Sequence, residues 1–301
     1  MVVRGLVSLL IFPGALFAVP MGWFMVWLQR RLNARLQGRI GPPFYQPFFD
    51  FIKLLAKERV TRSRLQGLVL TALPVLAVGA TLGVLALLPV FPEHAKFSGD
   101  LVLLVGLIEV IPLAAVLAGF ASRSLYGGLG ATREALLGLM YNLPFLAALG
   151  ALSVGAGSFS LSEIALKPMW AVRIPALIAL ALCIPVKLHM NPFSIANAEQ
   201  EIYAGATTEY GGPRLAIWEL AHDMEWVAVT GLWASLAFPV PHVALVVRLL
   251  VFVAISLALV VLLSIVGAAT ARLKLAQAAR VFWQWGFGIG LIAFIIAVLA
   301  R

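Results

Sequence analysis

Ionisable side chains inside apolar stretches are the residues of this chain that could do chemistry. Glu219, His222, Asp223 and Glu225 cluster early in one such stretch, and Glu109 falls inside another. A charged side chain at the centre of a bilayer costs about 2.5–3.5 kcal/mol on insertion scales, so such residues mark polar pathways for ions. Because Glu219 and Asp223 are four residues apart, they share one helix face, which we expect to point into the protein. The alternative is that this stretch begins later and the cluster lies among lipid headgroups.

Other kinds of site lack their sequence signatures. The chain has no Gly-rich phosphate loop, no nucleophile motif and no metal-ligand spacing. Cys183 is its only cysteine, so it can form neither an internal disulfide nor a cysteine cluster for a metal or an iron–sulfur centre. The histidines are scattered and favour plain polar roles over metal binding: they are His94, His189, His222 and His242. We therefore expect no catalytic centre and no bound cofactor in this chain.

The composition is that of a membrane protein. The 301 residues are 62% hydrophobic and 12% charged, with a mean hydropathy of +1.01. A soluble domain carries about 25% charged residues, so most of the outer surface must face lipid. Lipid offers no partner for an unpaired backbone group, which favours helices, and the apolar stretches exceed the roughly 10-residue segments of a membrane barrel. The sequence therefore predicts an all-α, polytopic integral membrane protein.

We expect one membrane domain, residues 1–301, with about eight spans of the ~20 residues that a bilayer requires. The spans are 5–28, 66–90, 101–120, 135–154, 173–190, 215–238, 243–267 and 281–300. The first begins like a signal peptide, but positive charge follows it directly, which favours a retained span.

The net charge of +9 is attributed to orientation in the membrane rather than to nucleic-acid binding. With eight spans both termini share one side, and the other side holds the loops 29–65, 121–134, 191–214 and 268–280. Sixteen of the 22 Lys and Arg fall on the side of these loops. The positive-inside rule therefore predicts cytoplasmic loops, both termini outside, and a location in the cell's inner (plasma) membrane.

Two loop segments have their own patterns. Residues 47–57 place apolar side chains at helical spacing, which predicts either a short amphipathic helix at the membrane surface or a simple tether; these side chains are Phe48, Phe49, Ile52 and Leu55. The loop 191–214 carries Glu199, Glu201 and Glu209 on the otherwise basic side. These acids either pair with arginines of the first loop, collect protons, or form a structural salt-bridge set.

Three segments together resemble the subunit 1 family of respiratory complex I and its hydrogenase relatives. They are Gln37-Gly-Arg39-Ile-Gly41-Pro42 with Gln46-Pro47 and Asp50 to Leu55; Gly119 to Gly127 with Ala131-Thr-Arg133-Glu134; and Pro192-Phe193 to Glu201 with Gly205, Thr208-Glu209-Tyr210 and Gly212. Only Pro43-Phe44-Tyr45 separates Pro42 from Gln46. This short form is similar to the membrane anchor of group 4 energy-converting nickel–iron hydrogenases such as formate hydrogenlyase.

The resemblance implies a non-redox membrane subunit that anchors a peripheral arm and couples electron transfer to movement of protons or sodium ions. The arm would carry iron–sulfur clusters and a nickel–iron centre or a quinone site, and antiporter-like membrane subunits would be further partners. The implied docking residues are Arg35, Gln37, Arg39, Gly41, Pro42, Gln46, Asp50, Lys53, Arg123, Arg133 and Glu134. The candidate coupling residues are Glu199, Glu201, Glu209, Glu219, His222, Asp223, Glu109 and Lys187.

The chain departs from the family pattern at usual acidic positions, which are occupied by Asn142, Lys187, Ser194 and Asn197. Asparagine and serine cannot carry a proton by ionising, whereas a buried Lys187 could titrate or pair with Glu219, Asp223 or Glu109. A purely structural anchor without an ion path, or a complex I-type quinone-site subunit, are therefore alternatives. A stand-alone secondary transporter is a remote one, because no pair of interrupted helices lies in matched halves.

Overall fold

A computed structural model describes residues 14–58, 64–90, 99–197, 199–202, 204–238 and 245–300. The side chains of Glu199, Gln200 and Leu245 lie outside the described part, as do His94 and His242. Every regular element in the described ranges is helical. The predicted all-α class of polytopic membrane protein is therefore confirmed.

Within the described ranges, six helical stretches are long and apolar enough to cross a bilayer. They are α4 (Arg64–Leu87), α5 (Asp100–Ala121), α6 (Leu125–Ala156), α8 (Trp170–Lys187), α11 (Leu245–Ala269) and the continuous run of α12 (Leu275–Arg280), η2 (Val281–Gly286) and α13 (Phe287–Leu299). Two further helices, α2 (Ala15–Leu36) and α10 (Gly212–Ala237), have 22 and 26 residues but are more polar. They correspond to the first and sixth predicted spans, which stay predictions.

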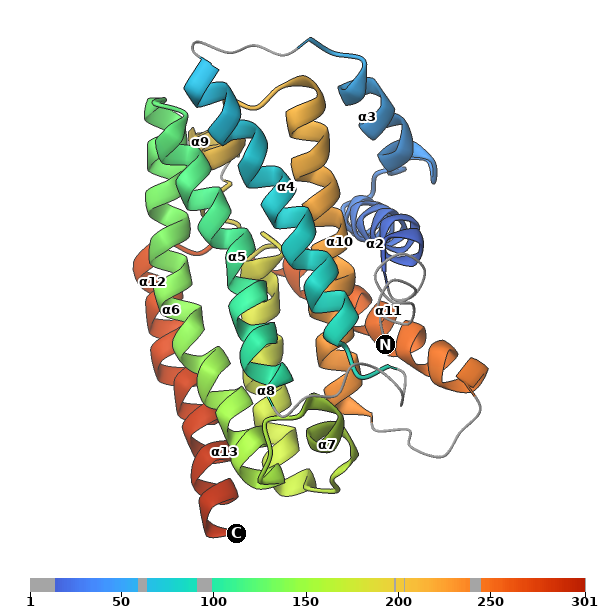
Figure 1. The fold of residues 1–301 in the computed structure, drawn as a ribbon, viewed down its shortest axis with the longest axis vertical. Helices are drawn as coiled ribbons and strands as arrows, with labels where there is room; N and C mark the ends of the chain where they lie inside the picture. The colour runs from blue at the N-terminus through green and yellow to red at the C-terminus, as the bar shows by residue number, and fades with distance from the viewer. Residues whose placement is uncertain are drawn as a thin grey trace.

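The helices form a bundle in which α4, α5, α6, α8, α10 and α13 run alongside one another, whereas α2 is seen nearly end-on and crosses them (Figure 1). Helix α10 packs against α2, α4, α8 and α11 and is buried along most of its length. Small residues allow this close approach, as is usual where helices meet in lipid. A Cβ on Gly22 of α2 would overlap the carbonyl of Asp223, so these two helices touch through backbone.

The predicted loop 121–134 is mostly helix, because α6 begins at Leu125. Gly127 and Gly130, which fall in this predicted loop, are positions of tight packing. A Cβ on Gly130 would lie 2.5 Å from the Cα of Gly205, in the 3₁₀ turn η1 (Gly205–Thr207). Tertiary contact has therefore overridden the local preference of glycine for turns. The neighbouring loop also holds the single helical turn α9 (Glu199–Ile202).

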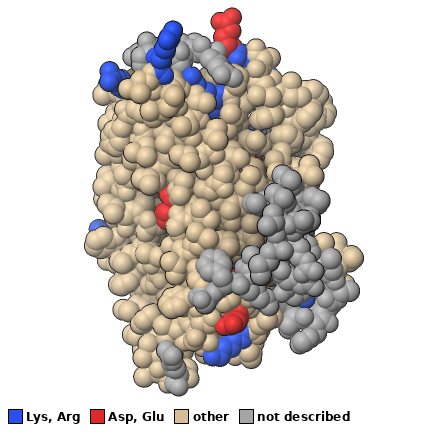
Figure 2. Space-filling view, viewed as in Figure 1, with Lys and Arg blue, Asp and Glu red and all other residues tan. Residues whose placement is uncertain are grey.

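The outer surface of the bundle is apolar through its middle. Large side chains of α5 that are exposed include Val102, Leu113 and Phe120. In Figure 2 most of the visible face is uncharged, one acidic group lies near its middle, and Lys and Arg gather mainly toward its two ends. That distribution is what a protein needs when lipid surrounds its middle and water meets its ends.

A short helix, α3 (Gln46–Leu55), forms in the segment that predicted an amphipathic helix. Pro47 lies in its first turn, where the missing N–H costs nothing. Of the predicted apolar face, Phe49 and Ile52 are exposed, whereas the ring of Phe48 lies 5.5 Å from that of Trp23 in α2; α3 also packs against α10. Its attachment to the membrane surface stays a prediction.

Candidate functional site

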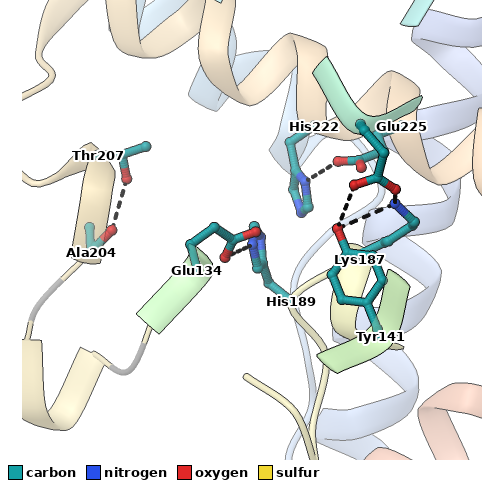
Figure 3. Close-up of polar contacts among 9 residues, drawn as sticks. Glu134, Tyr141, Lys187, His189, Ala204, Thr207, His222 and Glu225 are labelled. Atoms are coloured by element: carbon teal, nitrogen blue, oxygen red, sulfur yellow. Dashed lines mark hydrogen bonds and ion pairs between the residues drawn. The ribbon is translucent and has the colours of Figure 1, made fainter. Parts of the chain in front are cut away.

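A cavity of about 110 Å³ lies among α5, α6, α8 and α10, and ionisable side chains line it. We call it the polar cavity. Its ionisable and phenolic lining residues are Glu134, Tyr141, Lys187, His189, Glu219, His222 and Glu225. These side chains come from segments far apart in sequence, and the bundle brings them together; Figure 3 shows all of them except Glu219. A group of this kind inside a membrane bundle can hold and pass ions.

An ion pair between Lys187 and Glu109 closes one side of the polar cavity. The Nζ atom of Lys187 lies 2.6 Å from Oε1 of Glu109, and the exposed fractions of the two side chains are 1% and 26%. Tyr141 Oη and Asn142 Nδ2 each donate to the other carboxylate oxygen at 3.2 Å. The Nζ atom also lies 4.5 Å from the centre of the Tyr141 ring. The buried ammonium is therefore compensated by charge, hydrogen bonds and an aromatic face.

Two imidazole–carboxylate pairs lie side by side in the same cavity. His189 Nε2 is 3.2 Å from Glu134 Oε2, and His222 Nδ1 is 3.2 Å from Glu225 Oε2. The two rings are stacked, with centroids 5.1 Å apart. His189 has a φ of 50°, a left-handed conformation that is uncommon outside glycine and occurs here in the turn after α8. That turn aims the ring at α6 and α10 (Figure 3).

A second cavity, of about 270 Å³, lies between α2, α3 and α10. We call it the α3 cavity. Glu219 and Asp223 both line it, together with Arg30 and Lys53. The shared helix face predicted for Glu219 and Asp223 therefore does point into the protein. Glu219 borders both cavities, so one carboxylate lies between the two.

Two of the three loop acids, Glu201 and Glu209, lie at the surface and line neither cavity. Glu201 pairs with Arg133 at 2.6 Å and is about half exposed, and Glu209 is exposed. The side chain of Glu199 is outside the described residues. Arg133 belongs to α6, so the partner of Glu201 is not an arginine of the first loop, as one expectation had it.

The remaining residues at unusual family positions have identifiable contacts. Asn197 lines the polar cavity. Ser194 is hydrogen-bonded to Asn191 and accepts from Arg272 Nε at 3.3 Å. Three acids were possible partners of Lys187, and the structure pairs it with Glu109 instead of Glu219 or Asp223.

The predicted docking residues of the first loop form an exposed turn. Arg35, Gln37 and Arg39 are exposed. Gly41 has a φ of 78°, which only glycine adopts freely. The carbonyl of Pro42 accepts from Trp27 Nε1 at 3.2 Å and from Arg31 Nη1 at 3.1 Å, so the turn is fixed to α2.

Other predicted docking residues divide between surface and interior. Gln46 donates to Asp50 at 2.8 Å within α3, and Lys53 and Arg123 are exposed. Glu134 is different, because its side chain is buried and bound to His189. Sequence reasoning did not place Glu134, His189 and Tyr141 in one site, since no short-range spacing signals a contact across 55 residues of chain.

Comparison with known proteins gives consistent matches along the chain. A family model described as NADH dehydrogenase matches residues 8–298. Hydrogenase-4 component C of Escherichia coli strain K12 is 28% identical over 281 residues, which cover 89% of each chain. Formate hydrogenlyase subunit 4 of the same organism is 27% identical over 287 residues, 91% of this chain and 93% of that protein.

A solved structure has the same fold. A chain of the membrane-bound sulfane sulfur reductase, an archaeal respiratory membrane complex, superposes with a TM-score of 0.86 at 29% identity. The match covers 98% of this chain and 99% of the other. The resemblance drawn from the three sequence segments is confirmed.

Proposed function

We propose a function from the premise that this chain belongs to the NADH dehydrogenase subunit 1 family and is a membrane subunit of a complex I-like oxidoreductase. The subunit anchors a soluble arm that carries out the redox chemistry, and it couples that chemistry to ion movement. The observation that carries the proposal is the set of ionisable side chains enclosed between α5 and α10, in a chain whose relatives are hydrogenase subunits.

The arm docks on the exposed loop between α2 and α3. Arg35 and Arg39 supply positive charge there, and the hydrogen bonds to the Pro42 carbonyl hold the turn in place. A preorganised charged surface favours a partner of opposite charge and speeds its association. The arm carries the iron–sulfur clusters and the nickel–iron centre or quinone site, and this loop faces the cytoplasm at the inner membrane.

The coupling path runs from the α3 cavity to the polar cavity and ends at Glu109. Glu219 borders both cavities and so connects them. Glu109 is about a quarter exposed in the middle of α5, where a neighbouring antiporter-like subunit would meet it. Moving one charge against 100 mV requires about 2.3 kcal/mol, which electron transfer in the arm supplies.

A second candidate is a purely structural anchor, and the Lys187–Glu109 pair favours it. The buried ammonium of Lys187 donates to Glu109 and Tyr141, and Asn142 donates to the same glutamate, so the group would hold α5, α6 and α8 together permanently. Such a subunit would bind the arm but carry no ions. The two candidates differ in ion movement and agree in docking.

Docking is tested by reversing charge in the first loop. The double variant Arg35→Glu and Arg39→Glu should release the soluble arm while the chain stays in the membrane, as measured by co-purification from solubilised membranes. Lys167→Glu is the control, because this exposed lysine lies beside α7 (Leu161–Leu166), away from the first loop. Retention of the arm by the double variant would refute this docking surface.

Coupling is tested at the connection between the cavities. Glu219→Gln combined with Asp223→Asn should abolish ion transport in inverted membrane vesicles and leave electron transfer to a soluble dye intact. Glu163→Gln, which removes an exposed acid of α7, is the control and should change neither. Undiminished transport in the double variant would favour the structural anchor.

A further inference from the structure

We propose that His189 and His222 form a two-ring relay that moves a single proton from the ring paired with Glu134 to the ring paired with Glu225. The coupling ion at this point of the path is therefore the proton and not sodium. The inference rests on the proposed coupling function and deepens it, because neither the family match nor the relatives identify these histidines or the ion.

The positions of the two rings and their carboxylates suit a relay. In each pair a ring nitrogen lies 3.2 Å from a carboxylate oxygen, and the two rings are stacked with their centroids 5.1 Å apart. Glu134 comes from α6, His189 from the turn after α8, and His222 with Glu225 from α10. The relay therefore spans three elements, and the left-handed backbone of His189 keeps its ring in the cavity.

The charges around the rings favour one shared proton. Glu134 and Tyr141 of α6 line the cavity that holds the rings. Lys187 of α8 also lines it and is paired with Glu109 of α5. The groups from α10 are Glu219 and Glu225, and Asp223, which follows His222 directly, lines the α3 cavity together with Glu219. Two protonated rings at this separation would repel each other and the nearby Lys187 ammonium, since like charges interact strongly in a low-dielectric interior. One shared proton avoids this repulsion and still leaves a charged partner for either carboxylate.

The transfer step moves one proton and no electrons. In the first state His189 is protonated and pairs with Glu134, while His222 is neutral. An N–H bond of His189 breaks, its proton passes to cavity water, that water gives a proton to a ring nitrogen of His222, and the new cation pairs with Glu225. Stacked rings do not hydrogen-bond directly, but a cavity of about 110 Å³ has room for bridging water.

The ring nitrogens also argue for the identity of the ion. Imidazole changes charge near neutral pH and is suited to proton transfer. Hard cations such as sodium select oxygen ligands such as carbonyls and carboxylates. Here the two imidazoles lie between Glu134 and Glu225, so the two carboxylates do not bind one cation together.

The first experiment counts protons on the rings. The subunit is labelled with ¹⁵N-histidine in the assembled complex, reconstituted in lipid, and its signals are assigned with His189→Gln and His222→Gln. The pair should take up one proton in total over about pH 5 to 8, the range in which imidazoles ordinarily titrate. In each single variant the remaining ring should still take up one proton, so that the total uptake equals that of the unmodified pair. Independent uptake of one proton by each ring, or no uptake by either, would overturn the relay.

The second experiment measures transport in inverted vesicles that contain the complex and are energised with reduced methyl viologen. Each single variant should lower proton movement at least tenfold, and the double variant should be no worse than either single one. Viologen oxidation and complex assembly should be unchanged, which separates the relay from a structural role. Thr207→Val is the control, because this wall residue cannot titrate and its hydroxyl bonds only the Ala204 carbonyl.

The possible failures are distinguishable. If the unmodified complex moves protons and both histidine variants keep full transport, the relay is wrong and the coupling function stands. If the unmodified vesicles take up ²²Na⁺ without moving protons, the assignment of the proton is wrong. If they move neither ion, the coupling function fails, and the ring titration still decides whether the pair shares a proton.

Discussion

Lys187 Nζ lies 2.6 Å from Glu109 Oε1 and joins α8 to α5 inside the helix bundle. The pair is asymmetric, because the lysine side chain is almost fully buried while part of the glutamate reaches the surface. The lysine stands where relatives of complex I subunit 1 usually have an acid. Lys187 therefore places a buried positive charge at this position, and its counter-ion is Glu109 on α5.

The asymmetry of this pair predicts unequal effects of removing each partner. Glu109→Gln leaves a buried ammonium without its counter-ion and should cost about 3–5 kcal/mol of stability. Lys187→Gln should cost clearly less, because Glu109 retains access to solvent, and the double variant should recover part of the loss. Thermal denaturation of the purified complex measures the order. Equal losses, or a larger loss for Lys187→Gln, would contradict it.

Arg173 is expected to stabilise the short helix α7 through its carbonyl end. Its Nη2 atom donates to the carbonyls of Ile164, Ala165 and Lys167 at 2.7–3.0 Å, and its side chain is 1% exposed. Arg173→Met would leave these carbonyls unpaired and should cost at least about 3 kcal/mol, because each buried unsatisfied group costs about 1–3 kcal/mol.

Limited proteolysis checks this prediction about α7. Cleavage near residues 157–170 should accelerate in Arg173→Met, and less so in Arg173→Lys, which keeps the charge but lacks the planar fork. A protease pattern identical to that of the unmodified protein would mean that α7 is held by other contacts.

Two glycines of α6 should respond differently to the same substitution. A Cβ on Gly130 would lie 2.5–2.6 Å from backbone atoms of Gly205 and Ala206, whereas a Cβ on Gly138 meets nothing within 4 Å. Gly130→Ala should therefore displace η1 and lower the yield of assembled complex, and Gly138→Ala should leave the yield unchanged. Native gel electrophoresis of solubilised membranes compares the two. A normal yield for Gly130→Ala would show that η1 adjusts without cost.

The exposed pair of Arg133 and Glu201 should contribute little to stability. Exposed ion pairs contribute about 0–1 kcal/mol, so Glu201→Gln should shift the free energy of unfolding by less than about 1 kcal/mol. Arg133→Gln should cost more, because Arg133 also donates to the Ile195 carbonyl at 3.3 Å. Chemical denaturation of the two variants measures the difference, and a larger loss for Glu201→Gln would reverse this assignment.

The sequence predicted those features that depend on composition and local spacing. Charge scarcity identified the membrane class, and the spacing of Glu219 and Asp223 correctly placed both on one inward helix face. Periodicity favoured either a short helix or a tether at residues 47–57, and the structure has the helix α3 there, at Gln46–Leu55. These properties depend on composition or on spacing within one or two helix turns, so they can be predicted from a single sequence.

Other features depend on how helices rotate and pack against one another. Three acids were possible partners of Lys187, and only the packing of α5 against α6 and α8 selected Glu109. Glu134 was expected on a docking surface, but α6 begins early and turns it toward His189. No local pattern records the stacking of His189 on His222, because their approach requires the turn after α8 and the buried face of α10 together.

The most direct test of the whole account is purification of this subunit from its native membrane through an affinity tag, followed by mass spectrometry of everything that elutes with it. Soluble redox subunits with iron–sulfur clusters and further membrane subunits should be recovered in stoichiometric amounts, and the soluble ones should be lost in the Arg35→Glu, Arg39→Glu variant. Recovery of this polypeptide alone, under conditions mild enough to keep other membrane complexes intact, would contradict it.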